Sequence, residues 1–337
     1  MLRDLAPATT STFAPSATFA SSASSASSDW LASTGLRVLG GYRSLHATTS
    51  VGRLHALAAQ GSGPRPTLVG LHGFSSIGAH LAGLFRHLRP AFRAVIAPDL
   101  PGHGRSDAIP LHGNFAAIGA AIGDALAEWA HEPVILFGNS LGGVAAIQVA
   151  LQRPELVRGL VLASPGGADL PPEILTDFLG GFELGTHREA LAFVDRVLQT
   201  SPLTRQVLAW GVRRRFERPV HRAILARFGH EAVFSPADLA RLRMPILCLW
   251  GDRDRVLPAA AREYYRRHLP RHARFEMPAG LGHSPYLERP AAIARRIVSF
   301  VDALPPALPT LALTEGLRRR DGDGDRADAD RGIRAAG

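Results

Sequence analysis

Short apolar segments and amphipathic segments alternate along most of this chain. Apolar runs of strand length lie at 66–71, 94–97, 134–138, 160–163, 245–250 and 274–277. Segments with helical spacing of apolar residues lie between them, at 77–88, 115–130, 144–151, 259–268 and 291–301. Alternating positions in 35–59, with a turn at Val51-Gly52, indicate two further strands. This order predicts an α/β fold with a mostly parallel central sheet of about eight strands and helices on both faces.

The alternation stops between residues 165 and 243. This segment has no convincing strand pattern but several amphipathic helical runs, such as 189–198 and 203–216. Because the strand–helix order resumes after it, the segment interrupts the sheet rather than extending it. We therefore predict an α/β core formed by 35–164 and 244–304, with 165–243 inserted as a helical cap or lid.

The two ends of the chain lack any such pattern. Residues 1–34 are rich in Ser and Ala, and residues 305–337 are rich first in Pro and then in Arg, Asp and Gly. Neither end has enough apolar residues to form a core, so we predict a disordered leader and a disordered tail. The leader lacks the compact apolar region of a secretory signal, and no apolar run reaches the about 18 residues of a membrane span. A cytoplasmic location and no integral membrane segment are expected on these grounds.

The composition excludes several kinds of chemistry. All 38 basic residues are arginine, so a catalytic lysine or a lysine Schiff base is excluded. The single cysteine, Cys248, rules out a disulfide framework and a Cys-rich metal site within the chain. Its position in the apolar run 245–250 predicts that it packs in the core. No metal and no other cofactor are expected.

The net charge of +9 comes with one local cluster of basic residues. Seven arginines lie between residues 205 and 230 against one acid, Glu217: Arg205, Arg213, Arg214, Arg215, Arg218, Arg222 and Arg227. We interpret this cluster as a solvated helix face, and a surface that attracts anionic lipid or an acidic substrate as the alternative. Interleaved stacking aromatics and a nucleic-acid-binding module are both lacking, so no nucleic-acid partner is expected. The oligomeric state is left open.

A Gly-x-Ser-x-Gly sequence follows the apolar run at 134–138. Gly138-Asn139-Ser140-Leu141-Gly142 stands between a predicted strand and a predicted helix. A strand that ends in so tight a turn lifts the serine hydroxyl clear of the sheet, where it can act as a nucleophile. The alternative is a structural glycine-rich turn in which the serine only caps the helix.

Two later loops supply partners for that serine. A serine nucleophile needs a base, which a third group must orient. Asp254 follows the strand at 245–250, and His283 lies between the next strand and the last helix. In a parallel sheet these loops and that of Ser140 emerge at one edge, so we predict a Ser140–His283–Asp254 triad. Asp252 competes with Asp254 for the acidic role, and His103, in a glycine loop after a strand, could touch the site.

An acyl-transfer site also needs donors for the negative oxygen that develops on the substrate. The N–H of Leu141, directly after the nucleophile and at the helix start, is one expected donor. The loop after the strand at 66–71 should supply the other, and we assign it to the N–H of Phe74. We expect His72, Gly73 and Asn139 to contact the substrate, with Gly73 allowing close approach of the backbone.

Five segments in this order resemble the α/β-hydrolase superfamily, in its serine-nucleophile branch with a helical cap. They are Leu71-His72-Gly73-Phe74, Asp99-Leu100-Pro101-Gly102-His103-Gly104-Arg105-Ser106, Gly138-Asn139-Ser140-Leu141-Gly142-Gly143, Trp250-Gly251-Asp252-Arg253-Asp254 and Gly282-His283. The resemblance spans about residues 35–303 and implies an esterase, a lipase or a C–C bond hydrolase. Asn139 is similar to the residue found in hydrolases of meta-cleavage products, whereas the oxyanion loop lacks the additional glycines of that branch.

We therefore expect a cofactor-independent serine hydrolase that acts on small carboxylic esters through a covalent acyl-enzyme. The alternatives are a C–C bond hydrolase with the same triad and a catalytically silent ligand-binding protein on this fold. Apolar residues of the inserted segment suggest a hydrophobic acyl or aromatic pocket, unless they only pack the cap onto the core: Ile174, Leu175, Phe178, Leu179, Phe182, Phe193 and Val197.

Overall fold

One eight-stranded sheet organises the fold. The computed structural model describes residues 34–37, 40–108, 115–197 and 202–306. The strands are β1 (Arg43–Thr49), β2 (Gly52–Gln60), β3 (Leu68–Leu71), β4 (Ala94–Pro98), β5 (Val134–Ser140), β6 (Val157–Pro165), β7 (Ile246–Leu249) and β8 (Arg274–Glu276). Their order is β1-β2-β4-β3-β5-β6-β7-β8. β2 is antiparallel to both of its neighbours, and all other neighbouring pairs are parallel. The predicted fold class is confirmed.

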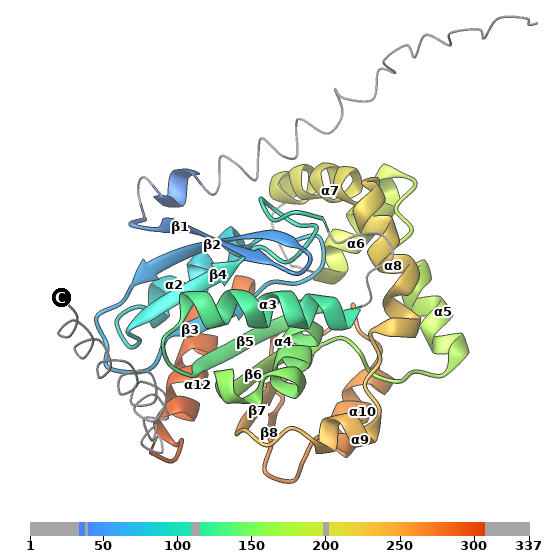
Figure 1. Cartoon of the computed structure of the whole chain (residues 1–337). Helices are drawn as coiled ribbons and strands as arrows, with labels where there is room; N and C mark the ends of the chain where they lie inside the picture. Colours follow the sequence, from blue (N-terminus) through green and yellow to red (C-terminus); the bar gives the residue numbers. More distant parts are fainter. Residues whose placement is uncertain (1–33, 38–39, 109–114, 198–201, 307–337) are drawn as a thin grey trace, which may run out of the picture. The chain divides into compact units, whose positions relative to one another are not determined.

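Helices cover both faces of this sheet (Figure 1). α3 and α4 pack together on one face, and α2 and α12 pack together on the other. Apart from a helical turn at 34–37, the helices described outside the inserted segment are η1 (Gly78–Leu81), α2 (Ala82–Leu88), α3 (Phe115–Trp129), α4 (Leu141–Gln152), η2 (Pro154–Leu156), α10 (Ala259–His268), α11 (Pro285–Glu288) and α12 (Pro290–Asp302). Because the strands from β4 to β8 are parallel, the loops at their carboxyl ends meet at one edge of the sheet.

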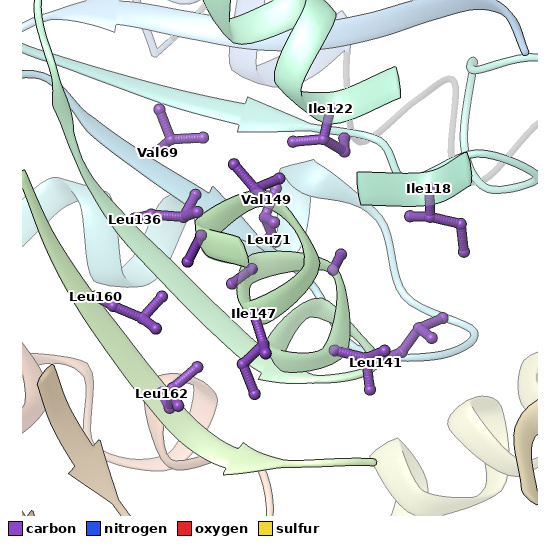
Figure 2. Close-up of a cluster of buried hydrophobic side chains, with 14 of the residues drawn as sticks. Val69, Leu71, Ile118, Ile122, Leu136, Leu141, Ile147, Val149, Leu160 and Leu162 are labelled. Carbon is purple, nitrogen blue, oxygen red and sulfur yellow. The ribbon is translucent and has the colours of Figure 1, made fainter. Parts of the chain in front are cut away.

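The core lies between the sheet and its helices. In β5 every residue from Val134 to Asn139 is buried, as is typical of a parallel strand that helices cover on both faces. Figure 2 shows side chains of β3, β5 and β6 meeting those of α3 and α4 around Leu136 and Ile147. Fully burying one such aliphatic side chain stabilises the fold by about 1.5–3 kcal/mol. The turn between β5 and α4 is therefore held by two well-buried elements.

The segment between β6 and β7 is helical in its described part. It forms α5 (Pro172–Gly180), α6 (His187–Val197), α7 (Pro202–Phe216), α8 (Pro219–Glu231) and α9 (Pro236–Ala240). The last residue of β6 is Pro165, so the strand pattern ends where the sequence predicted. The described residues up to Ala303 form one compact unit, so this segment packs with the sheet. The boundaries 165–243 of a separate cap stay a prediction.

Two helices begin differently from the prediction. α4 begins at Leu141 rather than at residue 144, directly after Ser140. The predicted helix at 77–88 is divided into η1 and α2. Gly78 starts η1 against β4, where an added Cβ would lie 2.4 Å from the Ala97 carbonyl oxygen. Apolar periodicity does not register such close backbone contacts, so it misses these starts.

The predicted leader and tail lie almost wholly outside the described residues. Among the helices of the described part, none combines the length and apolar character that crossing a bilayer requires. The cytoplasmic location stays a prediction.

Candidate active site

Ser140 stands at the turn between β5 and α4. Its backbone angles, φ 54° and ψ −116°, are costly for a residue other than glycine and persist only where the surroundings enforce them. An added Cβ at Gly138 would lie 2.3 Å from the Gly142 carbonyl oxygen, and one at Gly142 would lie 2.2 Å from that of Leu71. The two glycines therefore permit the close crossing of α4 over the sheet that raises Ser140.

His283 and Asp254 are in direct contact. His283 Nδ1 lies 2.9 Å from Asp254 Oδ2, and both side chains are buried. Asp254 Oδ1 accepts hydrogen bonds from the N–H groups of Val256 and Leu257, at 2.8 and 3.1 Å. Burial opposes ionisation of this carboxyl, but His283 and the two N–H donors outweigh it and lower the pKa of Asp254. A buried carboxylate thus holds one imidazole nitrogen and leaves Nε2 for other partners.

Asp252 has a different partner. Its Oδ1 accepts a hydrogen bond from the N–H of Leu281 at 3.1 Å, and Glu288 Oε2 accepts one from Gly282 at 2.9 Å. Two carboxylates therefore hold the loop that carries His283, while Asp254 alone contacts its imidazole. The structure thus separates the two acids that the sequence left in competition.

Asn139 connects the β5–α4 turn that carries Ser140, hereafter the elbow, to the loop that carries His283, hereafter the histidine loop. Its Nδ2 donates to the main-chain oxygen of His283 at 2.9 Å and to that of Ala163 at 2.8 Å. Hydrogen bonds among the described residues join His283 to Asp254 but do not join His283 to Ser140. Ser140 and His283 instead both line one cavity.

The loop that carries Phe74 runs beside Ser140. An added Cβ at Gly73 would lie 3.5 Å from Ser140 Cβ, so the loop backbone is in contact range of the elbow. The next residue, Ser75, has a φ of 59°. Its N–H donates to His103 Nε2 at 3.3 Å, and its carbonyl accepts from Arg215 Nη1 at 3.1 Å. His103 therefore supports this loop, while Arg215 ties it to α7.

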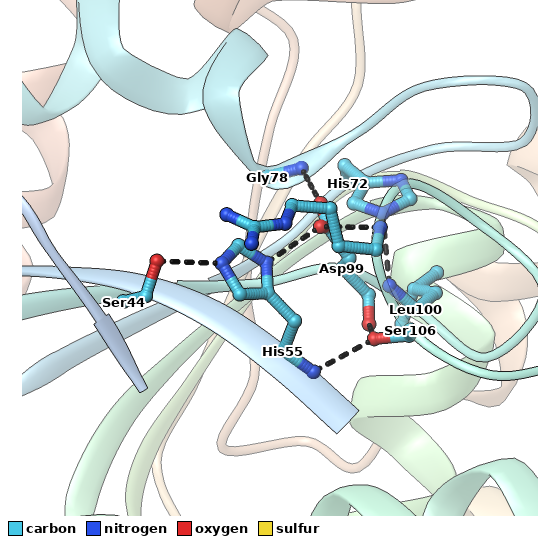
Figure 3. A network of polar contacts seen from close by, with 8 residues as sticks. Ser44, His55, His72, Gly78, Asp99, Leu100 and Ser106 are labelled. Carbon is cyan, nitrogen blue, oxygen red and sulfur yellow. Dashed lines mark hydrogen bonds and ion pairs between the residues drawn. The ribbon is translucent and has the colours of Figure 1, made fainter. Parts of the chain in front are cut away.

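A buried polar network also supports the loop that carries Phe74 (Figure 3). Asp99 Oδ1 accepts from the Gly78 N–H at 2.8 Å, and Asp99 Oδ2 lies 2.8 Å from His55 Nδ1. Burial alone would raise the pKa of Asp99. The hydrogen bond with His55 and further favourable contacts outweigh burial, so the pKa is lowered. His72 Nε2 accepts from Leu100 N–H at 3.0 Å, and its Nδ1 donates to the Gly73 carbonyl at 2.8 Å. Both ring nitrogens of His72 thus serve the backbone.

The prediction that His72 contacts the substrate differs from its place in the structure. His72 is fully buried and lies behind the cavity lining, because its ring is held between two loops. Gly73 and Asn139, by contrast, do line the cavity with Phe74 and Ser140.

The cavity lies between the sheet edge and the inserted helices. Its empty space, with the open mouth included, is about 820 Å³. Of the seven apolar residues expected to form a pocket, Phe182, Phe193 and Val197 line it, whereas Phe178 packs on the core. The sequence missed the rest of the lining, which is Ser75, Ser76, His80, Val194, Leu208, Val212, Arg215, Val256, Ser284, Tyr286 and Leu287. Leu208, Val212 and Arg215 are spaced four and three residues apart and so share one side of the predicted helical run 203–216. This spacing was the signal that could have placed α7 in the cavity wall.

Two histidines at or near this cavity, His80 and His221, have imidazoles with lowered pKa values. Burial, reinforced by Arg215, lowers the pKa of the lining residue His80 to about 3. His221 of α8 is buried against the rings of Phe74 and His103, with centroids at 5.2 and 4.8 Å. Burial, together with Arg218 and Arg215, lowers the pKa of His221 to about 3. The described residues of the inserted segment contribute mainly apolar side chains to the lining, together with Arg215.

The model of the alpha/beta hydrolase family matches residues 68–296. This chain belongs to that family. The match spans the elbow, the loop of Asp254 and the loop of His283, so the resemblance inferred from the five sequence segments is confirmed.

Curated relatives indicate a chemical class, and solved structures share the fold. The chain is 30% identical over 263 residues to a pimeloyl-[acyl-carrier protein] methyl ester esterase of Xanthomonas axonopodis pv. citri, a match that covers 72% of this chain and 98% of that one. Two similar solved structures from Bacillus subtilis are a carboxylesterase (TM-score 0.66, 23% identity, 82% and 98% covered) and a naproxen esterase (TM-score 0.67, 23% identity, 82% and 96% covered). The prediction of an enzyme of the ester hydrolase class is confirmed at the level of the family.

Proposed function

We propose that this protein hydrolyses carboxylic esters with an apolar acyl or aromatic group, by way of a covalent acyl-enzyme on Ser140. The observation that carries the proposal is the contact of His283 Nδ1 with Asp254, 2.9 Å long, in a loop that shares one cavity with the strained Ser140. A serine at a strained elbow, an imidazole and a buried carboxylate form the set of groups that acyl transfer requires.

The first half of the reaction forms the acyl-enzyme. Ser140 Oγ attacks the ester carbonyl carbon while its proton passes to His283 Nε2, and Asp254 stabilises the imidazolium that results. The carbonyl oxygen becomes an oxyanion, which the N–H groups of Phe74 and Leu141 receive. When the intermediate collapses, the C–O bond to the alcohol breaks and the leaving oxygen takes the proton from His283.

The second half repeats these steps with water. His283 accepts a proton from a water molecule, whose oxygen attacks the acyl carbon and breaks its bond to Ser140. The proton then returns to Ser140 Oγ, and the carboxylic acid leaves. Each backbone donor to the oxyanion typically accounts for about 3 kcal/mol of transition-state stabilisation, so the position of the Phe74 loop also affects the rate.

The lining supports an apolar substrate. Phe182, Phe193 and Val212 are among the apolar residues that line the cavity with Ser140, and an ester chain gains about 0.8 kcal/mol for each CH₂ group that it buries there. The pimeloyl-[acyl-carrier protein] methyl ester esterase and the two carboxylesterases named above act on esters by their names, which agrees with this chemistry.

Labelling with a fluorophosphonate probe tests the proposal. We expect one labelled site in the full chain, complete loss of label in Ser140→Ala, and retained label in Ser284→Ala, a control serine in the same cavity. Turnover of p-nitrophenyl esters of increasing chain length should accompany labelling and should exceed turnover of a vinylogous 1,5-diketone. Labelling that persists in Ser140→Ala would remove the nucleophile from the proposal, and faster turnover of the diketone would assign the site to C–C bond hydrolysis.

A further inference from the structure

α7 carries a row of exposed apolar side chains on its outer side. Leu203, Val207 and Trp210 are 77%, 63% and 50% exposed. Their spacing of four and three residues places them one above another on a single helix face. They are three of the five large apolar side chains that are exposed in the described part of the chain, the others being Met277 and Leu287. Contiguous exposure of this kind marks a surface that meets a partner.

Arginines lie at and after the C-terminal end of the same row. The Arg214 guanidinium carbon lies 4.4 Å from the centre of the Trp210 ring. Arg218 precedes α8 and Arg222 lies in its first turn, and within the described residues neither of the two makes an ion pair. Arg205, further toward the start of α7, is in contrast bound to Asp195 at 2.5 Å. The end of the row is thus cationic and suits a partner that carries negative charge.

The inner side of α7 forms part of the cavity wall. Leu208, Val212 and Arg215 of this helix line the cavity that also contains Ser140. Figure 1 shows α7 at the outer edge of the inserted helices, on the side away from the sheet. One helix, about 10 Å thick, therefore separates the exposed row from the apolar cavity.

We propose that the outer face of α7 docks this protein on an anionic lipid bilayer. Leu203, Val207 and Trp210 enter the interfacial region, and Arg214, Arg218 and Arg222 face the lipid phosphates. Tryptophan is enriched at the interface between membrane and water, and each arginine near an anionic bilayer adds electrostatic attraction. As a consequence that rests on the proposed function, the substrates are esters that partition into the bilayer.

A second copy of the chain fits this face less well. A two-fold symmetric contact places the same surface against itself. The same cationic patch would then lie on both sides of the contact, so the two copies would carry charge of the same sign into it, and like charges repel. An anionic bilayer satisfies the apolar row and the arginines together.

Vesicle binding by the full chain tests the proposal. We expect the protein to cosediment at low ionic strength with vesicles that contain phosphatidylglycerol, and only weakly with vesicles of phosphatidylcholine alone. The triple variant Leu203→Ser/Val207→Ser/Trp210→Ser should lose about tenfold or more in vesicle affinity, since three apolar side chains leave the interface. Changing Arg214, Arg218 and Arg222 to Gln should cost about fivefold for each arginine and weaken the dependence on salt.

Met277→Ser, which removes another exposed apolar side chain outside α7, is the matched control and should bind as the unchanged chain does. Circular dichroism of each variant checks that the fold is intact. Equal vesicle affinity of the triple variant and of Met277→Ser would overturn the proposal. So would a dimer in analytical ultracentrifugation that the triple variant dissociates, because the face would then belong to a second copy. Binding is measured without turnover and should persist in Ser140→Ala, so its outcome is independent of the esterase proposal.

Discussion

The side-chain amide of Asn139 and the main-chain oxygen of His283 lie 2.9 Å apart, although 144 residues separate them in the sequence. The same nitrogen donates to Ala163 O, so one buried amide joins the carboxyl ends of β5 and β6 to the histidine loop. Asn139 precedes Ser140 directly. The spacing between the proposed nucleophile and the proposed base therefore depends on a residue that need not take part in proton transfer.

Removing this amide should affect activity more than most buried substitutions do. In Asn139→Ala two buried carbonyl oxygens lose their donor, which should lower the free energy of unfolding by about 1–3 kcal/mol. A displacement of the histidine loop by about 1 Å should lower kcat/KM by about 100-fold. Ester kinetics and urea unfolding measure the two effects.

Gln152→Ala is the control for Asn139→Ala, because Gln152 is an exposed amide that also donates to a main-chain oxygen, that of Ala116. It should leave kcat/KM unchanged. Wild-type kcat/KM in Asn139→Ala would show that the histidine loop keeps its place without the amide.

The two acids of the β7 loop should differ sharply when each is changed to its amide. Asp254→Asn removes the carboxylate that holds His283 Nδ1–H, so the imidazole loses its tautomer and kcat should fall by about 1,000-fold or more. Asp252→Asn keeps an oxygen that can accept from Leu281 N–H, and kcat should fall by less than about tenfold. Steady-state kinetics of the pair decides the assignment, and a larger loss in Asp252→Asn would reverse it.

Sequence reasoning reached the parts of this site that local pattern determines. Strand and helix periodicity placed Ser140, Asp254 and His283 after strands of a parallel sheet, and the shared edge of such a sheet brings their loops together. It favoured Asp254 over Asp252, although position alone does not separate the two acids. The choice depends on which carboxylate contacts the His283 imidazole, and only the tertiary structure determines that contact.

The cavity wall was the least predictable part. Apolar residues of the inserted helices look alike in the sequence whether they pack on the core, as Phe178 does, or line the cavity, as Phe182 does. The contribution of α7 was missed because its inner and outer sides both carry apolar residues. The expected substrate contact of His72 stays a prediction, because a histidine beside an oxyanion loop can equally well hold the backbone of that loop, as the ring of His72 does.

Buried His221 should make the fold sensitive to mild acid. Its pKa in the folded protein is about 3, whereas an imidazole in the unfolded chain takes up a proton near pH 6.5. Between these values the unfolded state binds more protons, so the free energy of unfolding falls as the pH falls below about 6.5. Both ring nitrogens lack hydrogen-bond partners among the described residues, so replacement by an apolar side chain strands no partner.

His221→Leu should therefore reduce the loss of stability between pH 7.5 and pH 5.5 by on the order of 1 kcal/mol. Urea unfolding of both proteins at the two pH values measures the difference, and comparing each protein with itself cancels any packing change. An identical pH dependence of the two proteins would mean that His221 can be protonated without leaving the folded state.

Two glycines at helix starts should respond to alanine in opposite directions, which tests the packing of the elbow. At Gly142 in α4 an added Cβ would lie 2.2 Å from Leu71 O and 2.6 Å from His72 O, and neither backbone atom can move without shifting β3. Gly142→Ala should lower the free energy of unfolding by about 1–3 kcal/mol. It should also lower kcat, because the N–H of Leu141 and the Phe74 loop are displaced relative to each other.

Gly83 in α2 provides the control. An added Cβ there meets nothing within 4 Å, so Gly83→Ala should raise the free energy of unfolding by about 0.5 kcal/mol and leave kcat unchanged. Urea midpoints and ester kinetics of the two variants provide the comparison. Equal stability and activity of Gly142→Ala and Gly83→Ala would show that α4 crosses β3 less closely than these distances indicate. The close crossing would then not be the cause of the strained backbone at Ser140.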